Sequence, residues 1–191
     1  VSEAEAHPHV PEEKADLFLA YNTGTTEMEV LNWLHATVML LKPCSILETG
    51  SADGLGSLAL AAACRANGHG TVHSMELDKA SHERAKKLAS AAGLTDWITF
   101  HFGDSRELIR QGNTSFDFAF FDSICEIRAQ ECRIALESGR LQGPAVFHDT
   151  SPHRCRSLMT DPIAEEHTRY REEVHQIAIN HYGGRIFESE L

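Results

Sequence analysis

The sequence has little positive charge and no long apolar run. Among its 191 residues, 17 lysines and arginines stand against 28 acids, which gives a net charge of −11. No basic surface is evident that would neutralise phosphates, so we do not expect nucleic acid as the main partner. No stretch approaches the roughly 18 apolar residues that a membrane span needs, so we expect no membrane partner either. A small molecule fits best, and the sequence leaves open whether the chain forms a homodimer.

Cysteine pairs and a targeting segment are also missing. The five cysteines include no CxxC pair, so we expect reduced, buried thiols in a cytoplasmic protein. The first residues, Val1 to Glu5, are acidic and lack the charged-then-apolar layout of a signal peptide. Because the chain begins without methionine, the earlier removal of a targeting segment stays open.

Length and ordinary composition predict a single domain over residues 1–191. Residues 1–25 form an N-terminal arm in this interpretation, and residues 151–191 form a variable C-terminal part. In the latter, a polar helix is expected over 161–181 and a short strand over 185–187. Thr26 and Glu29 have the spacing of a capping box, which predicts the start of a helix that ends at Pro43.

Strand and helix patterns alternate along the middle of the chain. The expected strands are 44–48, 71–76, 97–102, 116–122 and 144–148, and the expected helices between them are 54–67, 78–92, 105–110 and 124–137. This alternation predicts an α/β fold, a Rossmann-like, doubly wound and mainly parallel sheet with helices on both faces.

Acidic residues stand at or just after the ends of the predicted strands. Ligands of open α/β sheets bind beyond the carboxyl ends of the strands, near the point where the strand order reverses. The shared position therefore predicts a binding site at this edge of the sheet. The residues are Glu48, Glu76, Asp104, Asp122 and Asp149.

The first strand leads into a glycine-rich loop over residues 48–54, Glu-Thr-Gly-Ser-Ala-Asp-Gly. Glycine lacks a Cβ and accepts positive φ, so such a loop lets the backbone approach a ligand and aim N–H groups at an anion. A tight structural turn is the alternative. Glu76 can accept hydrogen bonds from two ribose hydroxyls, because Asp78 is better placed to cap the next helix. For Asp104, contact with an adenine amino group and capping of the helix over 105–110 remain equally open.

These motifs, taken in order, resemble those of class I S-adenosylmethionine (SAM)-dependent methyltransferases. The resemblance rests on Glu48-x-Gly50-x-x-x-Gly54, Glu76, Gly103-Asp104-Ser105 and the run Phe116–Asp122, and it covers residues 23–150. Within that class the chain looks like small-molecule O-methyltransferases of the catechol and caffeoyl-CoA type. It looks closest to the macrocin O-methyltransferase and cephalosporin-hydroxylase-like proteins, in which the segment matching residues 23–27 borders the SAM pocket. The resemblance implies SAM as cofactor and a small hydroxylated molecule as methyl acceptor.

The resemblance also implies which residues hold the cofactor. Gly50, Ser51 and Gly54 would line the methionine part, and Glu48 would help to hold its amino end. Glu76 would bind the ribose, and Asp104 with Ser105 would flank the adenine. The full expected set is Thr25, Glu48, Gly50, Ser51, Gly54, Ser57, Glu76, Leu77, Asp104, Ser105 and Asp122.

By the same resemblance, the methyl acceptor and a cation would meet at Asp122, His148 and Asp149, the expected catalytic residues. Asp122 and Asp149 match acids that bind Mg²⁺ or a similar cation in metal-dependent members, and His148 or Thr150 would be a third ligand. Two carboxylates suit a hard divalent cation, whereas a histidine shifts the preference toward iron, manganese or zinc. The alternative is that Asp149 caps a loop and His148 makes ordinary hydrogen bonds.

One departure concerns the general base. Catechol-type enzymes carry a lysine three residues after the first metal-site acid, and this chain has Cys125 there. His148 and His153 are alternative bases, because imidazole titrates near neutral pH. Because this lysine is missing, a protein that binds SAM without catalysing methyl transfer stays an alternative interpretation.

A rival interpretation is an NAD(P)-dependent short-chain dehydrogenase. Residues 49–56 fit the TGxxxGxG loop of those enzymes, which also need a Tyr-x-x-x-Lys pair. None of the three tyrosines has a lysine at the fourth place, so this interpretation is the weaker one.

Overall fold

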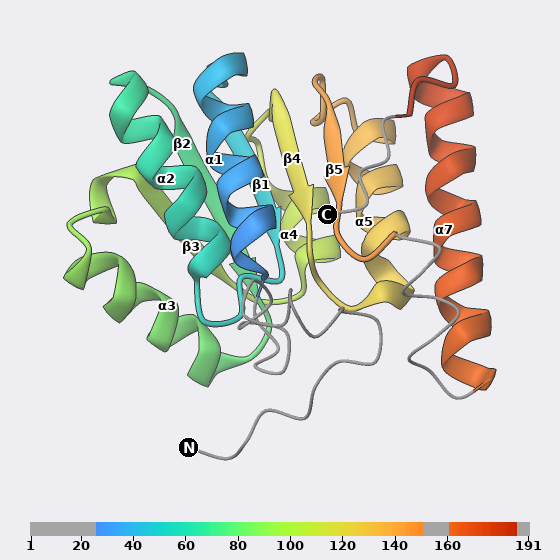
Figure 1. Ribbon diagram of the computed structural model, residues 1–191, viewed down its shortest axis with the longest axis horizontal. Coiled ribbons are helices and arrows are strands. Elements are labelled where there is room, and N and C mark those ends of the chain that lie inside the picture. Colours follow the sequence, from blue (N-terminus) through green and yellow to red (C-terminus); the bar gives the residue numbers. More distant parts are fainter. Residues whose placement is uncertain (1–25, 151–160, 187–191) are drawn as a thin grey trace, which may run out of the picture.

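The computed structural model describes residues 26–150 and 161–186. Five strands form one parallel sheet in the order β3-β2-β1-β4-β5 (Figure 1). The strands are β1 (Ser45–Thr49), β2 (Thr71–Glu76), β3 (Ile98–Phe102), β4 (Phe118–Phe121) and β5 (Ala145–Phe147). The helices are α1 (Met28–Leu41), α2 (Leu55–Asn67), α3 (Lys79–Ala91), the 3₁₀ turn η2 (Thr95–Trp97), α4 (Ser105–Gln111), α5 (Cys125–Glu137) and α7 (Asp161–Tyr182).

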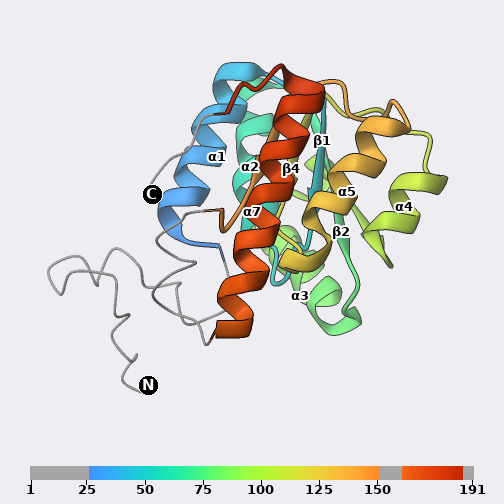
Figure 2. The ribbon, with the colours of Figure 1, turned by 90° about the vertical axis from the view of Figure 1, so that its right-hand side faces the viewer.

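Helices cover both faces of the sheet, as the alternating pattern predicts. Successive strand residues point to opposite faces, so Ile46 of β1 packs into one core with α1 and α2, and Leu47 packs into the other with α5 and α7. Figures 1 and 2 show α1, α2 and α3 on one side of the sheet and α4 and α5 on the other, with α7 at the β5 edge, where it packs against α5. All four residues of β4 are buried, because this strand is covered from both sides. The predicted doubly wound α/β fold is confirmed.

The point of chain reversal lies between β1 and β4. From β1 the chain proceeds outward to β2 and β3, then returns to β4 on the other side of β1. The loops that follow β1 and β4 therefore lie next to each other at this edge, and the helices to which they lead pack on opposite faces of the sheet. A ligand of such a sheet binds at this position.

The predicted capping box at the start of α1 is wrong. The N-cap residue is Glu27, and no side chain caps the helix. The hydroxyl of Thr26 instead donates to Asp122 Oδ2 over 2.9 Å, so it is used by a residue far away in the sequence. The spacing of neighbouring residues in the sequence cannot reveal such a distant partner.

The predicted strand at 185–187 is also wrong for its described part. Gly183 and Gly184 both have positive φ and end α7. The N–H of Gly184 donates to Ala178 O and that of Arg185 to Tyr182 O, so the backbone is engaged with the helix end. Residues 185 and 186 form no strand, and residue 187 lies outside the described residues.

Two smaller expectations also need correction. Trp97 belongs to the η2 turn, so β3 begins one residue later than predicted. Cys64 and Cys132 are buried, but Cys44 is exposed and Cys125 is half-buried. The expectation of buried thiols therefore holds for only two of the described cysteines. Within the described residues no helix is long and apolar enough to cross a membrane. The residues Thr25, His153 and Cys155 lie outside the described ranges.

Candidate active site

The glycines of the loop after β1 are required by contacts within the protein. Gly50 has φ 77°, and a Cβ there would lie 2.5 Å from the backbone oxygen of Asp122 and from Cα of Ser123. Gly54 has φ 91°, and its Cβ would lie 2.8 Å from Cβ of Ala85 on α3. The loop therefore passes against the chain that follows β4 on one side and against α3 on the other.

The backbone N–H groups of this loop are largely used inside the protein. Gly50 and Ser51 donate to the backbone oxygen of Met75, and Gly54 donates to Ser51 O. Ala52 donates to Glu76 Oε2 over 2.8 Å. The expectation that the loop aims free N–H groups at an anion is therefore wrong for these four residues, whose hydrogen bonds tie the loop to the end of β2.

Glu76 lies half-buried at the carboxyl end of β2. One oxygen accepts from Ala52 N and the other from Asp78 N, each over 2.8 Å. A carboxylate oxygen can accept a second hydrogen bond, so Glu76 keeps acceptor capacity after it has fixed both loops. Asp78 caps α3 by accepting from Ser81 N, as predicted.

Glu48 lies beneath the first turn of α2, only 1% exposed. Its carboxylate accepts a short hydrogen bond from the hydroxyl of Ser57, which also lies 2.9 Å from the hydroxyl of Ser74. Gly56 lies so close that a Cβ would overlap Glu48 Oε1. Burial raises the pKa of Glu48 to about 7, although both serine hydroxyls favour its charged form. The predicted cofactor contacts Glu48 and Ser57 are thus bonded to each other.

On the side of β3, the capping interpretation of Asp104 is confirmed. Asp104 accepts from Arg106 N as the N-cap of α4, and the Arg106 guanidinium lies 2.6 Å from its other oxygen. This guanidinium lowers the pKa of the Asp104 carboxyl. Ser105 is buried, and its hydroxyl donates to Glu131. Leu77 follows Glu76 and is 67% exposed.

Glu131 is a functional candidate that the sequence did not reveal. It is fully buried on α5 and accepts hydrogen bonds from three hydroxyls, those of Thr49 (2.8 Å), Ser123 (2.7 Å) and Ser105. These donors come from the end of β1, the chain after β4 and the start of α4. Burial raises the pKa of Glu131. This single carboxylate therefore joins three of the chain segments that border the candidate site.

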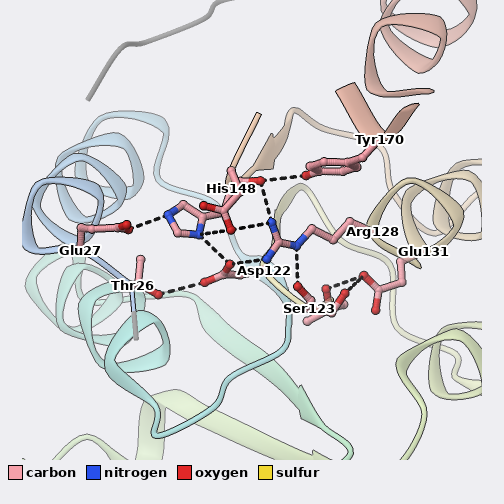
Figure 3. A network of polar contacts seen from close by, with 10 residues as sticks. Thr26, Glu27, Asp122, Ser123, Arg128, Glu131, His148 and Tyr170 are labelled. Atoms are coloured by element: carbon pink, nitrogen blue, oxygen red, sulfur yellow. Dashed lines mark hydrogen bonds and ion pairs between the residues drawn. The ribbon is translucent and has the colours of Figure 1, made fainter. Parts of the chain in front are cut away.

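A second polar network lies on the other side of the strand reversal, centred on Asp122 (Figure 3). One oxygen of Asp122 accepts from the Thr26 hydroxyl over 2.9 Å. The other lies 2.8 Å from His148 Nδ1 and 3.1 Å from Arg128 Nη2. The predicted residues Asp122, His148 and Asp149 are brought together here, with Arg128 in addition.

Arg128 lies between two of the predicted metal ligands. Its Nη2 is 3.1 Å from Asp122 Oδ1, and its Nη1 is 3.1 Å from Asp149 Oδ2. It also donates to the backbone oxygens of Ser123 (2.5 Å) and His148 (2.7 Å). The guanidinium is only 6% exposed, and because the charges of Asp122 and Asp149 surround it, its pKa stays above the usual range despite the opposing effect of burial.

Tyr170 of α7 closes this network from the far side. Its hydroxyl donates to His148 O over 2.9 Å, and Arg128 lies 5.6 Å from the centre of its ring, within the range of a cation–π contact. Asp149 has φ 62°, a left-handed conformation that aspartate accepts more readily than most residues. The turn after β5 is thus held by Arg128 and Tyr170 together.

His148 is held by a carboxylate at each ring nitrogen. Nδ1 lies 2.8 Å from Asp122 Oδ1, and Nε2 lies 2.7 Å from Glu27 Oε2. Burial by itself lowers the pKa of His148, but these two acids and Asp149 raise it to about 10. At neutral pH the ring is therefore an imidazolium, with both N–H groups donated. His148 thus makes the hydrogen bonds that the alternative interpretation expects, and its role as a general base remains a prediction.

The fit of these residues to a metal is mixed. Potential ligand atoms of Glu27, His148 and Asp149 lie within 4.8 Å of one another, which is close enough to surround a cation. Both nitrogens of His148 are engaged, however, and Arg128 stands beside Asp149. Among the described residues, Thr150 forms no hydrogen bond with the network. The metal site therefore remains a prediction.

Comparison with known proteins identifies the family. Residues 47–150, more than half of the chain, match the methyltransferase domain. The chain belongs to this methyltransferase family. No curated protein matches it in sequence.

Solved structures share the fold of this methyltransferase at low sequence identity. The SAH-bound methyltransferase PaMTH1 of Podospora anserina is 15% identical over 91% of this chain and 80% of its own, with a TM-score of 0.71. The O-methyltransferase TomG of Streptomyces achromogenes, in complex with SAM, is 20% identical over 85% and 77%, with a TM-score of 0.65. An O-methyltransferase of Bacillus cereus, in complex with SAH, is 20% identical over 89% and 79%, with a TM-score of 0.67.

The match to the methyltransferase domain includes the glycine-rich loop, Glu76, Arg128 and Asp149, but not Glu27 or Tyr170. The network around Asp122 therefore draws on residues from both sides of the matched region.

Proposed function

We propose that this methyltransferase uses SAM to methylate an oxygen of a small hydroxylated molecule. The observation that carries the proposal is the family match, because the matched region contains the loop with Glu76 and, from the network, Asp122, Arg128, His148 and Asp149, on opposite sides of the strand reversal. Structures named as O-methyltransferases, in complex with SAM or SAH, share the fold. A cofactor on one side and an acceptor on the other is the arrangement that transfer between them requires.

The cofactor half would lie along β1, β2 and β3. Glu76 has acceptor capacity for ribose hydroxyls, and Gly50 and Gly54 keep the loop after β1 close to the sheet. Leu77 and Phe102, at the carboxyl ends of the neighbouring strands β2 and β3, are 67% and 53% exposed, and their apolar side chains would suit contact with an adenine.

The acceptor half would be the network around Asp122. When bound, SAM would supply an electrophilic methyl group, which bonds to the acceptor oxygen as its bond to the sulfur breaks, so that SAH leaves and the hydroxyl proton is released. Alignment then supplies much of the rate. Asp122 and Asp149 would orient the acceptor hydroxyl, while Thr26, Arg128 and His148 hold these carboxylates in place.

Calorimetric titration tests the cofactor. We expect SAM and SAH to bind and NADH not to bind; binding of NADH without binding of SAM would refute the methyltransferase assignment.

Glu76→Ala should weaken SAM binding by about tenfold or more, because hydrogen bonds to a charged acceptor contribute about 1.5–3 kcal/mol each. Asp149→Ala should leave SAM binding nearly unchanged and remove transfer to a panel of hydroxylated acceptors. Equal loss of SAM affinity in both variants would contradict this division of roles.

A second candidate is a protein that binds SAM without catalysis. Cys125 stands where related enzymes carry a lysine base, and His148 donates to two carboxylates. SAM binding combined with no transfer to any acceptor of the panel would favour this candidate.

A further inference from the structure

Arg128 occupies the space between the two carboxylates that would share a metal. Its two terminal nitrogens lie 3.1 Å from Asp122 and 3.1 Å from Asp149, one nitrogen to each acid. Both acids are nearly buried, with side-chain exposures of 12% and 11%. Figure 3 shows the guanidinium of Arg128 beside Asp122 and His148. A cation that bridged both acids would need the place that this group takes.

The position of the guanidinium is fixed by contacts in several directions. The backbone oxygens of Ser123 and His148 accept from it on two sides, and the ring of Tyr170 lies against it. An arginine does not lose its proton in proteins, and its planar fork suits two carboxylates at once. Arg128 is therefore a permanent positive charge that these contacts hold at a set place.

The remaining potential ligands are engaged as well. His148 contacts Asp122 through Nδ1 and Glu27 through Nε2, so neither nitrogen is available to a metal while this network stands. A cation at Glu27, His148 and Asp149 would have to break these contacts and lie near the charge of Arg128. Like charges at short range in a low-dielectric site repel strongly.

We propose that Arg128 takes the place of a divalent cation in this site, so that the protein holds Asp122 and Asp149 in position without a metal. Arg128 is a positioning residue that acts through the two carboxylates, because it donates to both and offsets part of their negative charge. The role in catalysis rests on the proposed function, whereas the exclusion of metal does not depend on it.

Titration of the protein with Mn²⁺, followed by electron paramagnetic resonance, tests the exclusion directly. We expect the wild type to show no saturable binding at micromolar Mn²⁺. Arg128→Gln should bind Mn²⁺ at least about tenfold more tightly, because a nearby positive charge has been removed. The matched control is Arg133→Gln on the same helix, whose side chain pairs with Glu173 and is 37% exposed; it should behave like the wild type. Mn²⁺ binding by the wild type as tight as that of Arg128→Gln would overturn the proposal.

A second measurement, on the wild type alone, tests the proposal even if Arg128→Gln does not fold. The melting temperature of the wild type, dialysed against EDTA, should not change when excess Mn²⁺ or Mg²⁺ is added, since a ligand that binds the native state raises it. A clear rise would overturn the proposal. SAM affinity measured in the same samples should be insensitive to EDTA. If SAM does not bind at all, the proposed function fails, while the Mn²⁺ result still decides the role of Arg128.

Discussion

Glu48 makes the stability of this methyltransferase depend on pH in an unusual direction. Its pKa is raised from 4.5 to about 7 because the carboxyl is buried beneath α2. Between these two values the native state binds a proton that the unfolded chain has released. The stabilising contribution is therefore complete below about pH 4.5 and is lost as the pH rises through 7. The pKa difference corresponds to about 3 kcal/mol of unfolding free energy across this window.

Glu48→Gln should remove this dependence. Glutamine has nearly the same size, carries no proton to lose, and keeps an oxygen that accepts from the Ser57 hydroxyl. We expect its free energy of unfolding to increase relative to that of the wild type, so that the variant gains about 3 kcal/mol of relative stability between about pH 4.5 and pH 8. Urea denaturation across this range measures the difference, with Glu83→Gln on the exposed side of α3 as control. If Glu48→Gln shows the same pH slope as the wild type, the argument from burial is refuted.

Two further predictions concern the segments that border the site. Gly50 and Gly68 have nearly equal φ values, 77° and 76°, but a Cβ meets backbone atoms at 2.5 Å only at Gly50 and meets nothing within 4 Å at Gly68. Gly68→Ala should therefore cost about 1 kcal/mol of stability and Gly50→Ala about 3 kcal/mol or more; equal costs in denaturant unfolding would show that the close approach does not matter. Glu131→Gln should cost about 1–3 kcal/mol and weaken SAM binding, because the amide nitrogen replaces one of the two accepting oxygens and leaves at least one of the three hydroxyls without its acceptor. The exposed control on the same helix is Glu137→Gln, and a thermal melt that does not separate the two variants would count against this role of Glu131.

The sheet and its binding edge were predictable because they follow from local patterns. The apolar runs at 46–47 and 118–121 and the glycines of the first loop set strand and turn positions through residue periodicity and backbone freedom. The strand ends then placed Glu76, Asp122 and Asp149 at one edge, since parallel strands end on the same side. The first strand was predicted one residue too early, and the fourth was predicted too long at both ends, by residues 116, 117 and 122.

The bonding partners within the site were not predictable, because they join distant parts of the chain. Arg128 and Glu131 on a helix would ordinarily be assigned to its solvated face, yet both are buried. The spacing of Ala129, Cys132 and Ala135 marks the buried side of α5. Arg128 and Glu131 stand next to this side, and this was the signal in the sequence that could have revealed their burial. Thr26 matched a local capping motif, but its hydroxyl donates to Asp122 instead.

The placement of Arg128 and Glu131 also determines how α5 is held against the sheet. Most helices of such folds rest on apolar side chains, which tolerate small sliding movements because their contacts have little directional preference. On α5 the inward side carries small residues together with two charged groups whose hydrogen bonds require fixed directions. A shift of α5 by a single residue would break contacts to the acceptor half and to the cofactor half at the same time. The position of α5 along its own axis therefore affects both halves of the site. A change in α5 that alters one half also disturbs the other.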